Sequence, residues 1–116
     1  MKAIVAGCRD VTDFNLVQTA IDNSGFEITE LVSGRATGVD ALGERWAREN
    51  SVKITTFPAD WRTHGKAAGP IRNAQMAEYA DALIAVWDGV SRGTKNMINE
   101  AKKRELNVYV FNFERE

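Results

Sequence analysis

Glycine recurs at a fixed spacing in three segments of this chain, and each segment also holds an arginine or a lysine. The spacing is Gly-x-x-x-Gly, at residues 34–38, 65–69 and 89–93. Glycine permits a positive φ and lets a ligand approach the backbone closely, and an arginine guanidinium matches phosphate through two parallel hydrogen bonds. This combination favours the binding of phosphate or another anion. The alternative is structural, because the loops of α/β proteins often need glycine simply to turn.

The familiar nucleotide-binding motifs are missing from the sequence. It contains no GxGxxG and no GxxxxGK[ST], since Gly89–Lys95 has the wrong spacing for the second motif. An ordinary dinucleotide-binding site or P-loop is therefore disfavoured. The chain has one cysteine, Cys8, and one histidine, His64, so it lacks the residue clusters that usually bind metals. We expect neither a metal nor a cofactor.

Several other residues have a chemical and a structural interpretation. Trp61 and Trp87 can stack on a nucleobase beside the arginines, or they can cover the end of a sheet. Asp40 can bind ribose hydroxyls, or it can cap its own helix. Cys8 ends an apolar segment and no histidine can be placed beside it, so we interpret it as a small apolar residue rather than a nucleophile. Trp46 is assigned to the core.

Two alternating periodicities predict the elements that hold these residues. Short apolar runs predict strands at residues 2–8, 27–33, 52–57, 81–87 and 107–113. Helical spacing of apolar residues predicts a first helix between a cap at Thr12 or Asp13 and a stop at Gly25. Three more helices are predicted at residues 39–49, 70–79 and 94–104. Residues 59–70 are predicted to form a long loop, and residues 114–116 a solvated end.

This order of elements predicts an α/β protein, with a Rossmann-like, doubly wound, five-stranded parallel sheet and helices on both faces. We expect the strand order 3-2-1-4-5, with the ligand at the carboxyl ends of the strands. The loops at that edge hold seven basic residues and four acidic ones, so the edge is positive although the whole chain has a net charge of −1. The basic residues are Arg9, Arg35, Arg62, Lys66, Arg72, Arg92 and Lys95, and the acidic residues are Asp10, Asp40, Asp60 and Asp88.

Length and composition are those of a small globular protein. The 116 residues are 44% hydrophobic and 27% charged, which predicts a single domain spanning residues 1–116. Because the chain shows no membrane span, no secretory signal and one cysteine, we expect a cytoplasmic location, in a bacterium or in the host of a phage. The near-neutral charge argues against a long nucleic acid as partner. The helices of such a fold can pack into a homodimer or a larger homo-oligomer, and the sequence specifies no interface.

Five short segments resemble, in the same order, motifs of the SLOG superfamily, and most closely its small YspA/YpsA-like branch. The segments are Gly7–Asp10, Ser33–Asp40, Phe57–Trp61, Ala68–Asn73 with Met76, and Gly93–Met97. The superfamily includes LOG phosphoribohydrolases and DprA-type DNA-processing proteins, so the resemblance implies a Rossmann-like fold that binds nucleotides or their derivatives. LOG enzymes use an arginine, matched here by Arg72, and a glutamate, whose matching position here is Met97.

Three hypotheses about function follow. The first is binding of a nucleotide or a nucleotide-derived phosphorylated ligand, as a sensor, a carrier or a sequestering module. The second is hydrolysis of the N-glycosidic bond of a nucleoside 5′-monophosphate, with Arg72, Asp40 and Asp60 as catalytic candidates; Met97 in place of the glutamate counts against it. The third is a DprA-like module that binds single-stranded DNA. The predicted ligand-binding residues are Gly7, Arg9, Asp10, Gly34, Arg35, Thr37, Gly38, Asp40, Asp60, Trp61, Lys66, Arg72, Asn73, Trp87, Gly89, Ser91, Gly93, Thr94 and Asn96.

Overall fold

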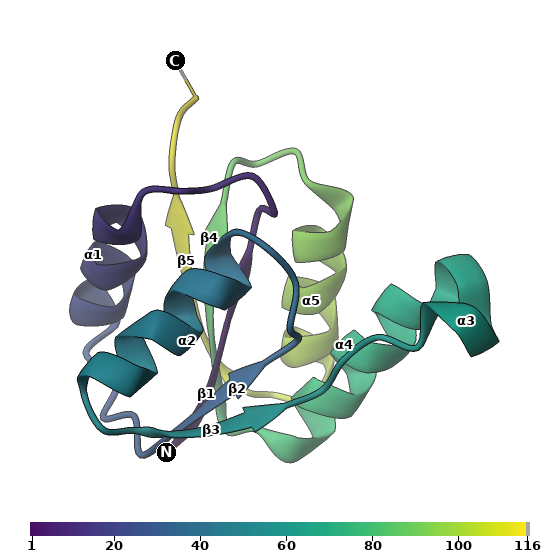
Figure 1. The fold of residues 1–116 in the computed structure, drawn as a ribbon, viewed down its shortest axis with the longest axis horizontal. Helices are drawn as coiled ribbons and strands as arrows, with labels where there is room; N and C mark the ends of the chain where they lie inside the picture. Colours follow the sequence, from purple (N-terminus) through teal and green to yellow (C-terminus); the bar gives the residue numbers. More distant parts are fainter. Residues whose placement is uncertain (116) are drawn as a thin grey trace.

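In the computed structural model, which describes residues 1–115, five parallel strands form one sheet (Figure 1). The strands are β1 (Lys2–Gly7), β2 (Glu30–Ser33), β3 (Lys53–Thr56), β4 (Ala82–Trp87) and β5 (Asn107–Asn112). Their order across the sheet is β3-β2-β1-β4-β5, and each neighbouring pair is parallel. The predicted fold class and strand order are confirmed.

Helices cover both faces of the sheet. The helices α1 (Phe14–Ser24) and α2 (Val39–Glu49) pack on one face, and α4 (Ala68–Tyr79) and α5 (Arg92–Lys103) pack on the other (Figure 1). The residues predicted to begin and end α1 do so in the structure. The Asp13 side chain accepts a hydrogen bond from the backbone N–H of Asn15 at 2.9 Å, and Gly25 ends the helix in the left-handed conformation.

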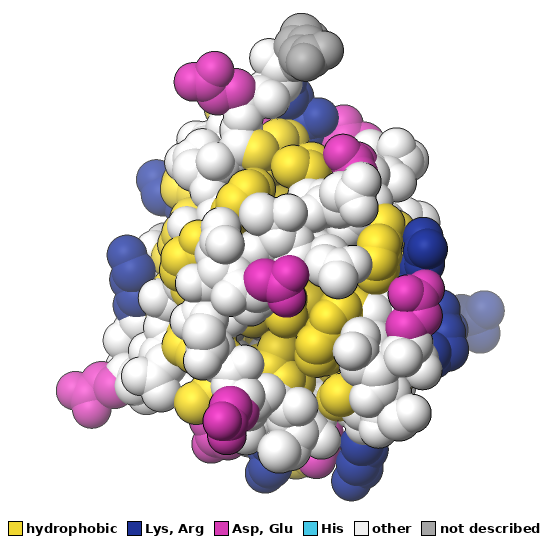
Figure 2. Space-filling model, turned by 90° about the vertical axis from the view of Figure 1, so that its left-hand side faces the viewer, with side chains coloured by type: hydrophobic (Ala, Val, Ile, Leu, Met, Phe, Trp, Pro, Cys, Tyr) yellow, Lys and Arg dark blue, Asp and Glu magenta, His cyan; other side chains and the backbone are white. Residues whose placement is uncertain are grey.

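Neighbouring residues of the central strands enter opposite cores. Ile4 packs toward α4 and α5, whereas the next residue, Val5, packs toward α1 and α2, and both side chains are fully buried. This two-sided burial fixes the register of β1, because a slip by one residue would exchange the two faces. On the α1 side, partly buried hydrophobic side chains close the core, among them Trp46 as predicted, and some reach the surface between polar groups (Figure 2).

The prediction of a loop over residues 59–70 is wrong. The chain forms a short helix, α3 (Trp61–His64), then a 3-10 turn, η1 (Gly65–Ala67), and α4 begins at Ala68. The Asp60 side chain accepts a hydrogen bond from the Thr63 N–H at 3.1 Å and so caps α3. Pro70 lies in the first turn of α4, where its missing N–H costs no helical hydrogen bond. Helix α3 lies away from the sheet, on the side of β3 and α4 (Figure 1).

Strand and helix ends differ from prediction by up to three residues elsewhere. Strand β2 begins at Glu30 rather than at residue 27, and α5 begins at Arg92 rather than at residue 94. The earlier start of α5 moves Arg92 and Gly93 from a loop into the first turn of the helix. Within residues 1–115, no helix is both long enough and apolar enough to cross a membrane.

Candidate ligand-binding site

A pocket of about 500 Å³ opens at the carboxyl ends of β1 and β4, between the first turns of α2 and α5 and the start of α4. We call it the first chamber. This volume is in the range of small-molecule sites. Buried apolar residues, including Ala6, Met76 and Met97, contribute to its walls. The predicted site residues that line it are Gly7, Arg9, Asp10, Asp40, Trp61, Arg72, Asn73, Ser91, Gly93, Thr94 and Asn96.

A second pocket, of about 350 Å³, adjoins the first on the side of β2 and β3. We call it the second chamber. The two share four residues, Arg9, Ala36, Trp61 and Arg72, which form a common wall. The residues that line only the second chamber are Gly34, Arg35, Thr37, Pro58 and Ala59.

Five predicted site residues line neither chamber: Gly38, Asp60, Lys66, Trp87 and Gly89. Trp87 packs between the two cores, and its indole N–H donates a hydrogen bond to the Ser91 carbonyl at 3.0 Å. This geometry favours the structural interpretation of Trp87. Asp60 caps α3, and Lys66 lies exposed in η1. His64 is exposed at the end of α3.

Gly38 serves the packing of two loops. It adopts φ of +71° before α2, and a Cβ atom there would lie 2.3 Å from the Cys8 carbonyl oxygen. The next N–H, that of Val39, donates to the same carbonyl at 3.2 Å, and the Thr37 hydroxyl donates to the Arg9 carbonyl at 3.0 Å. The loops after β1 and β2 are thereby held together, and this places Arg9 at the common wall.

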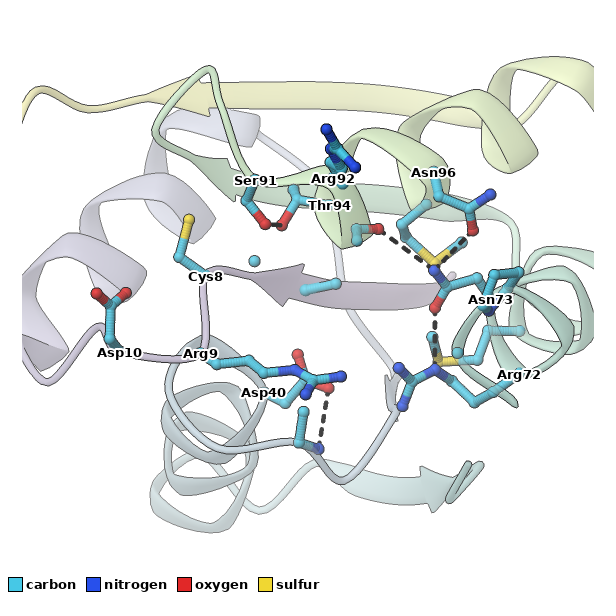
Figure 3. Close-up of a pocket in the computed structure, with 18 of the residues that line it drawn as sticks. Cys8, Arg9, Asp10, Asp40, Arg72, Asn73, Ser91, Arg92, Thr94 and Asn96 are labelled. Carbon is cyan, nitrogen blue, oxygen red and sulfur yellow. Dashed lines mark hydrogen bonds between the residues drawn. The ribbon is translucent and has the colours of Figure 1, made fainter. Parts of the chain in front are cut away.

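Arg72 is the most deeply buried cation of the site, with 8% of its surface exposed. Its Nη1 donates a hydrogen bond to the Gly34 carbonyl at 2.6 Å. Its Nε donates to Oδ1 of Asn73 at 2.9 Å (Figure 3). Burial lowers the pKa of this guanidinium, and the nearby Asp40 carboxylate opposes that effect. Within residues 1–115, Arg72 makes no ion pair with a carboxylate. It is a buried charge without a directly bonded counter-ion.

Gly34 accommodates this guanidinium. A Cβ atom at residue 34 would lie 2.6 Å from Nη1 of Arg72 and 3.0 Å from Oδ2 of Asp40, distances at which neighbouring groups must move. Glycine here lets the Arg72 guanidinium and the Asp40 carboxyl pack directly against the backbone.

Asp40 lies in the first turn of α2, with 4% of its surface exposed. Its Oδ2 accepts a hydrogen bond from the Ala36 N–H at 3.2 Å, in the loop before the helix, and α2 has no side-chain cap, so of the two interpretations of Asp40 the structure does not bear out the capping one. Burial raises the pKa of Asp40 to about 6, although the Ala36 hydrogen bond and the Arg72 charge act against this. Asp40 lines the first chamber, where a carboxyl group of this kind can accept a hydrogen bond or exchange a proton.

The first turn of α5 presents unbonded backbone donors to the first chamber. Ser91 is the N-cap, but its hydroxyl pairs with the Thr94 hydroxyl at 3.3 Å instead of capping the helix. Within residues 1–115, the N–H groups of Arg92, Gly93 and Thr94 have no hydrogen-bond partner. Gly93 leaves open space, since no atom lies within 4 Å of where its Cβ would be. Such a helix end attracts anions through its free N–H groups and its dipole.

A hydrogen-bonded chain connects Arg72 to this helix end. The Asn73 side-chain nitrogen donates to Oδ1 of Asn96 at 2.9 Å and to the Gly93 carbonyl at 3.4 Å (Figure 3). Asn73 is 6% exposed and receives the Arg72 hydrogen bond through its oxygen. These hydrogen bonds through Asn73 fix the position of the Arg72 guanidinium relative to the first turn of α5.

Arg115 is a site residue that sequence reasoning missed. The segment 114–116 is predicted to be solvated, but the Arg115 guanidinium donates to both oxygens of Asp10, at 2.8 and 3.0 Å, and to Oδ2 of Asp88 at 3.0 Å. Arg115 is exposed to solvent, as predicted, but its guanidinium is held by these two carboxylates, which the sequence did not indicate; Glu116 lies outside the described residues. Hydrogen bonds from the Ser91 and Val90 N–H groups, with Arg115 added, hold the pKa of Asp88 well below its usual range. Two carboxylates near the chamber are thus already paired.

The remaining charges favour an anionic ligand. With Arg115 and Asp10 paired to each other, the first chamber is lined by Arg9, Arg72 and Arg92 against Asp40. The second chamber is lined by three arginines and, among residues 1–115, by no acidic residue. Arg9 lies over the Trp61 ring, 5.5 Å from its centre, and makes no ion pair within the described chain. No group of three histidines, cysteines or carboxylates in that part of the chain could hold a metal ion.

The chain is similar to several known proteins. The family model described as "YspA, cpYpsA-related SLOG family" matches residues 1–64. The gene 61 protein of Mycobacterium phage D29 is 38% identical over 87 residues, which cover 70% of each chain. The SPbeta prophage-derived protein YoqJ of Bacillus subtilis is 41% identical over 49 residues, covering 37% of this chain and 29% of the relative.

Among solved structures, DNA processing protein A (DprA) from Streptococcus pneumoniae has a similar fold, with a TM-score of 0.72 at 18% sequence identity. The superposition covers 94% of this chain but only 49% of DprA, so this chain spans about half the length of that protein. The family model, in contrast, spans more than half of this chain, and the phage D29 relative aligns over 70% of both sequences. This chain belongs to the YspA, cpYpsA-related SLOG family.

Proposed function

We propose that this protein binds a nucleotide or a nucleotide-derived phosphorylated ligand in the first chamber. The observation that carries the proposal is the buried Arg72 guanidinium, which lacks an ion-pair partner within residues 1–115 and is hydrogen-bonded, through Asn73, to the uncapped first turn of α5. A buried charge without a counter-ion is costly. An anionic ligand would supply that counter-ion and would accept hydrogen bonds from the free N–H groups of α5.

The chamber offers a place for each part of such a ligand. A phosphate group fits between Arg72 and the first turn of α5. The apolar walls at Met76 and Met97, with the Trp61 ring at the rim, suit a nucleobase. The Asp40 carboxyl is then available to ribose hydroxyls. Membership of the SLOG family and the DprA-like fold support a role related to nucleotides or nucleic acids.

The biological role we propose is that of a sensor, a carrier or a sequestering module, in which residues 1–116 act as one nucleotide-binding domain. The phage and prophage relatives support action in the cytoplasm of a bacterium. Assembly into a homo-oligomer is part of the same proposal, and sedimentation analysis with and without ligand would test it. Binding of single-stranded DNA ranks below these roles, because its support is the fold of DprA alone.

Calorimetry with AMP and other nucleoside monophosphates tests the binding proposal. We expect wild-type protein to bind at least one of them, and Arg72→Ala to weaken binding by about 100-fold, as expected for loss of a charged hydrogen-bonding partner. Arg48→Ala is the matched control, because Arg48 is an exposed arginine at the far end of α2 and lines neither chamber. No binding at millimolar concentration, or equal binding by Arg72→Ala, would overturn the proposal.

Asp40 supports a second candidate, cleavage of the N-glycosidic bond of a nucleoside 5′-monophosphate. Such cleavage uses a carboxyl group to activate water or to stabilise the sugar cation. Met97 lines the chamber but carries no carboxyl group, and Asp60 lies outside it, so Asp40 is the better candidate of the two aspartates. Release of free base from AMP, abolished by Asp40→Asn with binding retained, would support hydrolysis. Binding of AMP without release of the free base would exclude hydrolysis and leave ligand binding as the function.

A further inference from the structure

The second chamber has the composition of an additional anion site. Arg9, Arg35 and Arg72 line it, with no acidic residue from the described part of the chain. Arg35 is paired through Nη1 with Glu44 at 2.7 Å, but its side chain is 55% exposed and the fork keeps other N–H groups free to donate. Arg9 makes no ion pair with any residue from 1 to 115. At least one cation of this chamber is therefore not neutralised by the protein.

The two chambers adjoin along the common wall. Their common wall contains the Arg9 guanidinium, which lies over the Trp61 ring, and the Arg72 guanidinium, which rests on Gly34. Figure 3 shows Arg9, from the loop after β1, and Arg72, from α4, pointing toward each other, with Asp40 beside Arg9. An anion at this wall would contact cations that belong to both chambers at once.

We propose that the ligand contains a nucleoside diphosphate moiety, whose phosphate chain crosses the common wall and whose second phosphate lies in the second chamber. This inference rests on the proposed function, since it extends the ligand of the first chamber. A monophosphate would use Arg72 and the first turn of α5 and leave the second chamber without a counter-ion. A second phosphate bonded to the first reaches Arg9 and Arg35, and it gains charge-assisted hydrogen bonds there.

The substituent on the second phosphate can be hydrogen or a further group. The second chamber has a volume of about 350 Å³, which is larger than one phosphate needs and leaves space for a sugar. A free nucleoside diphosphate and a diphosphate-linked conjugate present the same diphosphate to Arg9 and Arg35. The experiment therefore compares AMP, ADP and ADP-glucose.

Titration calorimetry on wild type and on Ala59→Trp tests the inference. Ala59 is partly buried and lines only the second chamber, so an indole there fills that chamber and leaves the first one open. We expect wild type to bind ADP about tenfold more tightly than AMP. Ala59→Trp should remove this preference without changing the affinity for AMP. Ala41→Trp, at an exposed position of α2 outside both chambers, is the control and should keep the preference.

The outcomes separate the two proposals. Absence of binding by all three nucleotides would overturn the proposed function itself. Binding of AMP and ADP with equal affinity, or a preference for ADP that survives in Ala59→Trp, would overturn only the assignment of the second chamber. Tighter binding of ADP-glucose than of ADP identifies a conjugate as ligand, and weaker binding identifies the free diphosphate. If Ala59→Trp lowers the melting temperature, Ala59→Leu provides a smaller obstruction for the same comparison.

Discussion

Arg72 and Asn73 are neighbours in α4 whose side chains bond to each other, the Arg72 Nε donating to Oδ1 of Asn73 at 2.9 Å. Asn73 passes the connection on, because its nitrogen donates to Oδ1 of Asn96 in α5 at 2.9 Å. The direction of the guanidinium is thus set by a residue that has both an acceptor and a donor. Leucine has the same number and branching of side-chain heavy atoms and neither group.

Asn73→Leu should therefore weaken nucleotide binding even though Arg72 is still present. We expect a loss of stability of about 1–3 kcal/mol, because Arg72 and Asn96 lose a buried partner. We also expect a loss of affinity larger than that in Asn99→Leu, a control at an exposed position of α5. Urea unfolding and calorimetry measure the two effects. An Asn73→Leu protein that binds AMP as wild type does would contradict the positioning role.

Gly34→Ala should reduce affinity by displacing Arg72. The added Cβ would lie 2.6 Å from Nη1, so the guanidinium must shift and its hydrogen bond to the Gly34 carbonyl should weaken. We expect an affinity loss of about tenfold or more, the effect of one charged hydrogen bond. Gly25→Ala is the matched control. It has open space around the Cβ position but a φ of +70°, so it should cost about 1 kcal/mol of stability and leave binding unchanged.

Asp40 should make the stability of the protein depend on pH. Its pKa rises from 3.8 to about 6 on folding, so the folded state holds the proton more tightly than the unfolded state. The free energy of unfolding contributed by this group should fall as the pH rises from about 4 to about 6, by about 3 kcal/mol in total. Urea unfolding across this range should show that fall in wild type relative to Asp40→Asn. Parallel curves for the two proteins would refute the prediction.

The same substitution has an expected effect on binding. Asp40→Asn removes a negative charge next to Arg9 and Arg72, so affinity for AMP above pH 6 should rise by a few-fold if the ribose makes no essential bond to the carboxylate. Because the phosphate group of AMP itself gains a proton near pH 6, the informative quantity is the difference between the two proteins at each pH. A fall in affinity would instead assign the carboxylate to the ribose hydroxyls.

Arg115→Ala should weaken anion binding through two carboxylates that it leaves unpaired. Asp10 and Asp88 would then carry free negative charge near the first chamber. We expect a few-fold loss of affinity that shrinks as salt is added, since Arg115 and Asp10 are exposed and their charges are screened by salt. The double variant Arg115→Ala, Asp10→Asn should recover part of the loss. Equal affinities of wild type and Arg115→Ala at low ionic strength would show that the paired carboxylates do not influence the ligand.

Much of the fold follows from local patterns in the sequence. The spacing of Val39, Leu42, Trp46 and Ala47 predicts α2 with the same ends that the structure shows, because one apolar face must meet the sheet. The segment after β3 is different. Gly65, Gly69 and Pro70 are typical of a loop, and the helical conformation of α3 depends on one side-chain cap from Asp60. A prediction from sequence alone therefore favours a loop here, because the local composition is a stronger signal than one possible capping residue.

The site divides in the same way. Arg72 and the glycine segments can be assigned from their place after predicted strands, because parallel strands bring those loops to one edge. Arg115 cannot, since its bond to Asp10 joins residues 105 positions apart and no periodicity marks it. The second chamber is equally hidden from the sequence, because Ala36, Pro58 and Ala59 have no chemical signal of their own and become walls only through packing.

The exposed segment that supplies Trp61 has an evolutionary consequence. Each residue from Trp61 to Ala67 is exposed, so this segment adds a wall to both chambers while contributing little to either core. Substitutions at exposed positions usually change stability by less than about 0.5 kcal/mol. Selection can therefore alter the wall, and with it the choice of ligand, while Arg72 and the sheet beneath stay the same. Relatives that share this fold would then be able to diverge quickly in what they recognise.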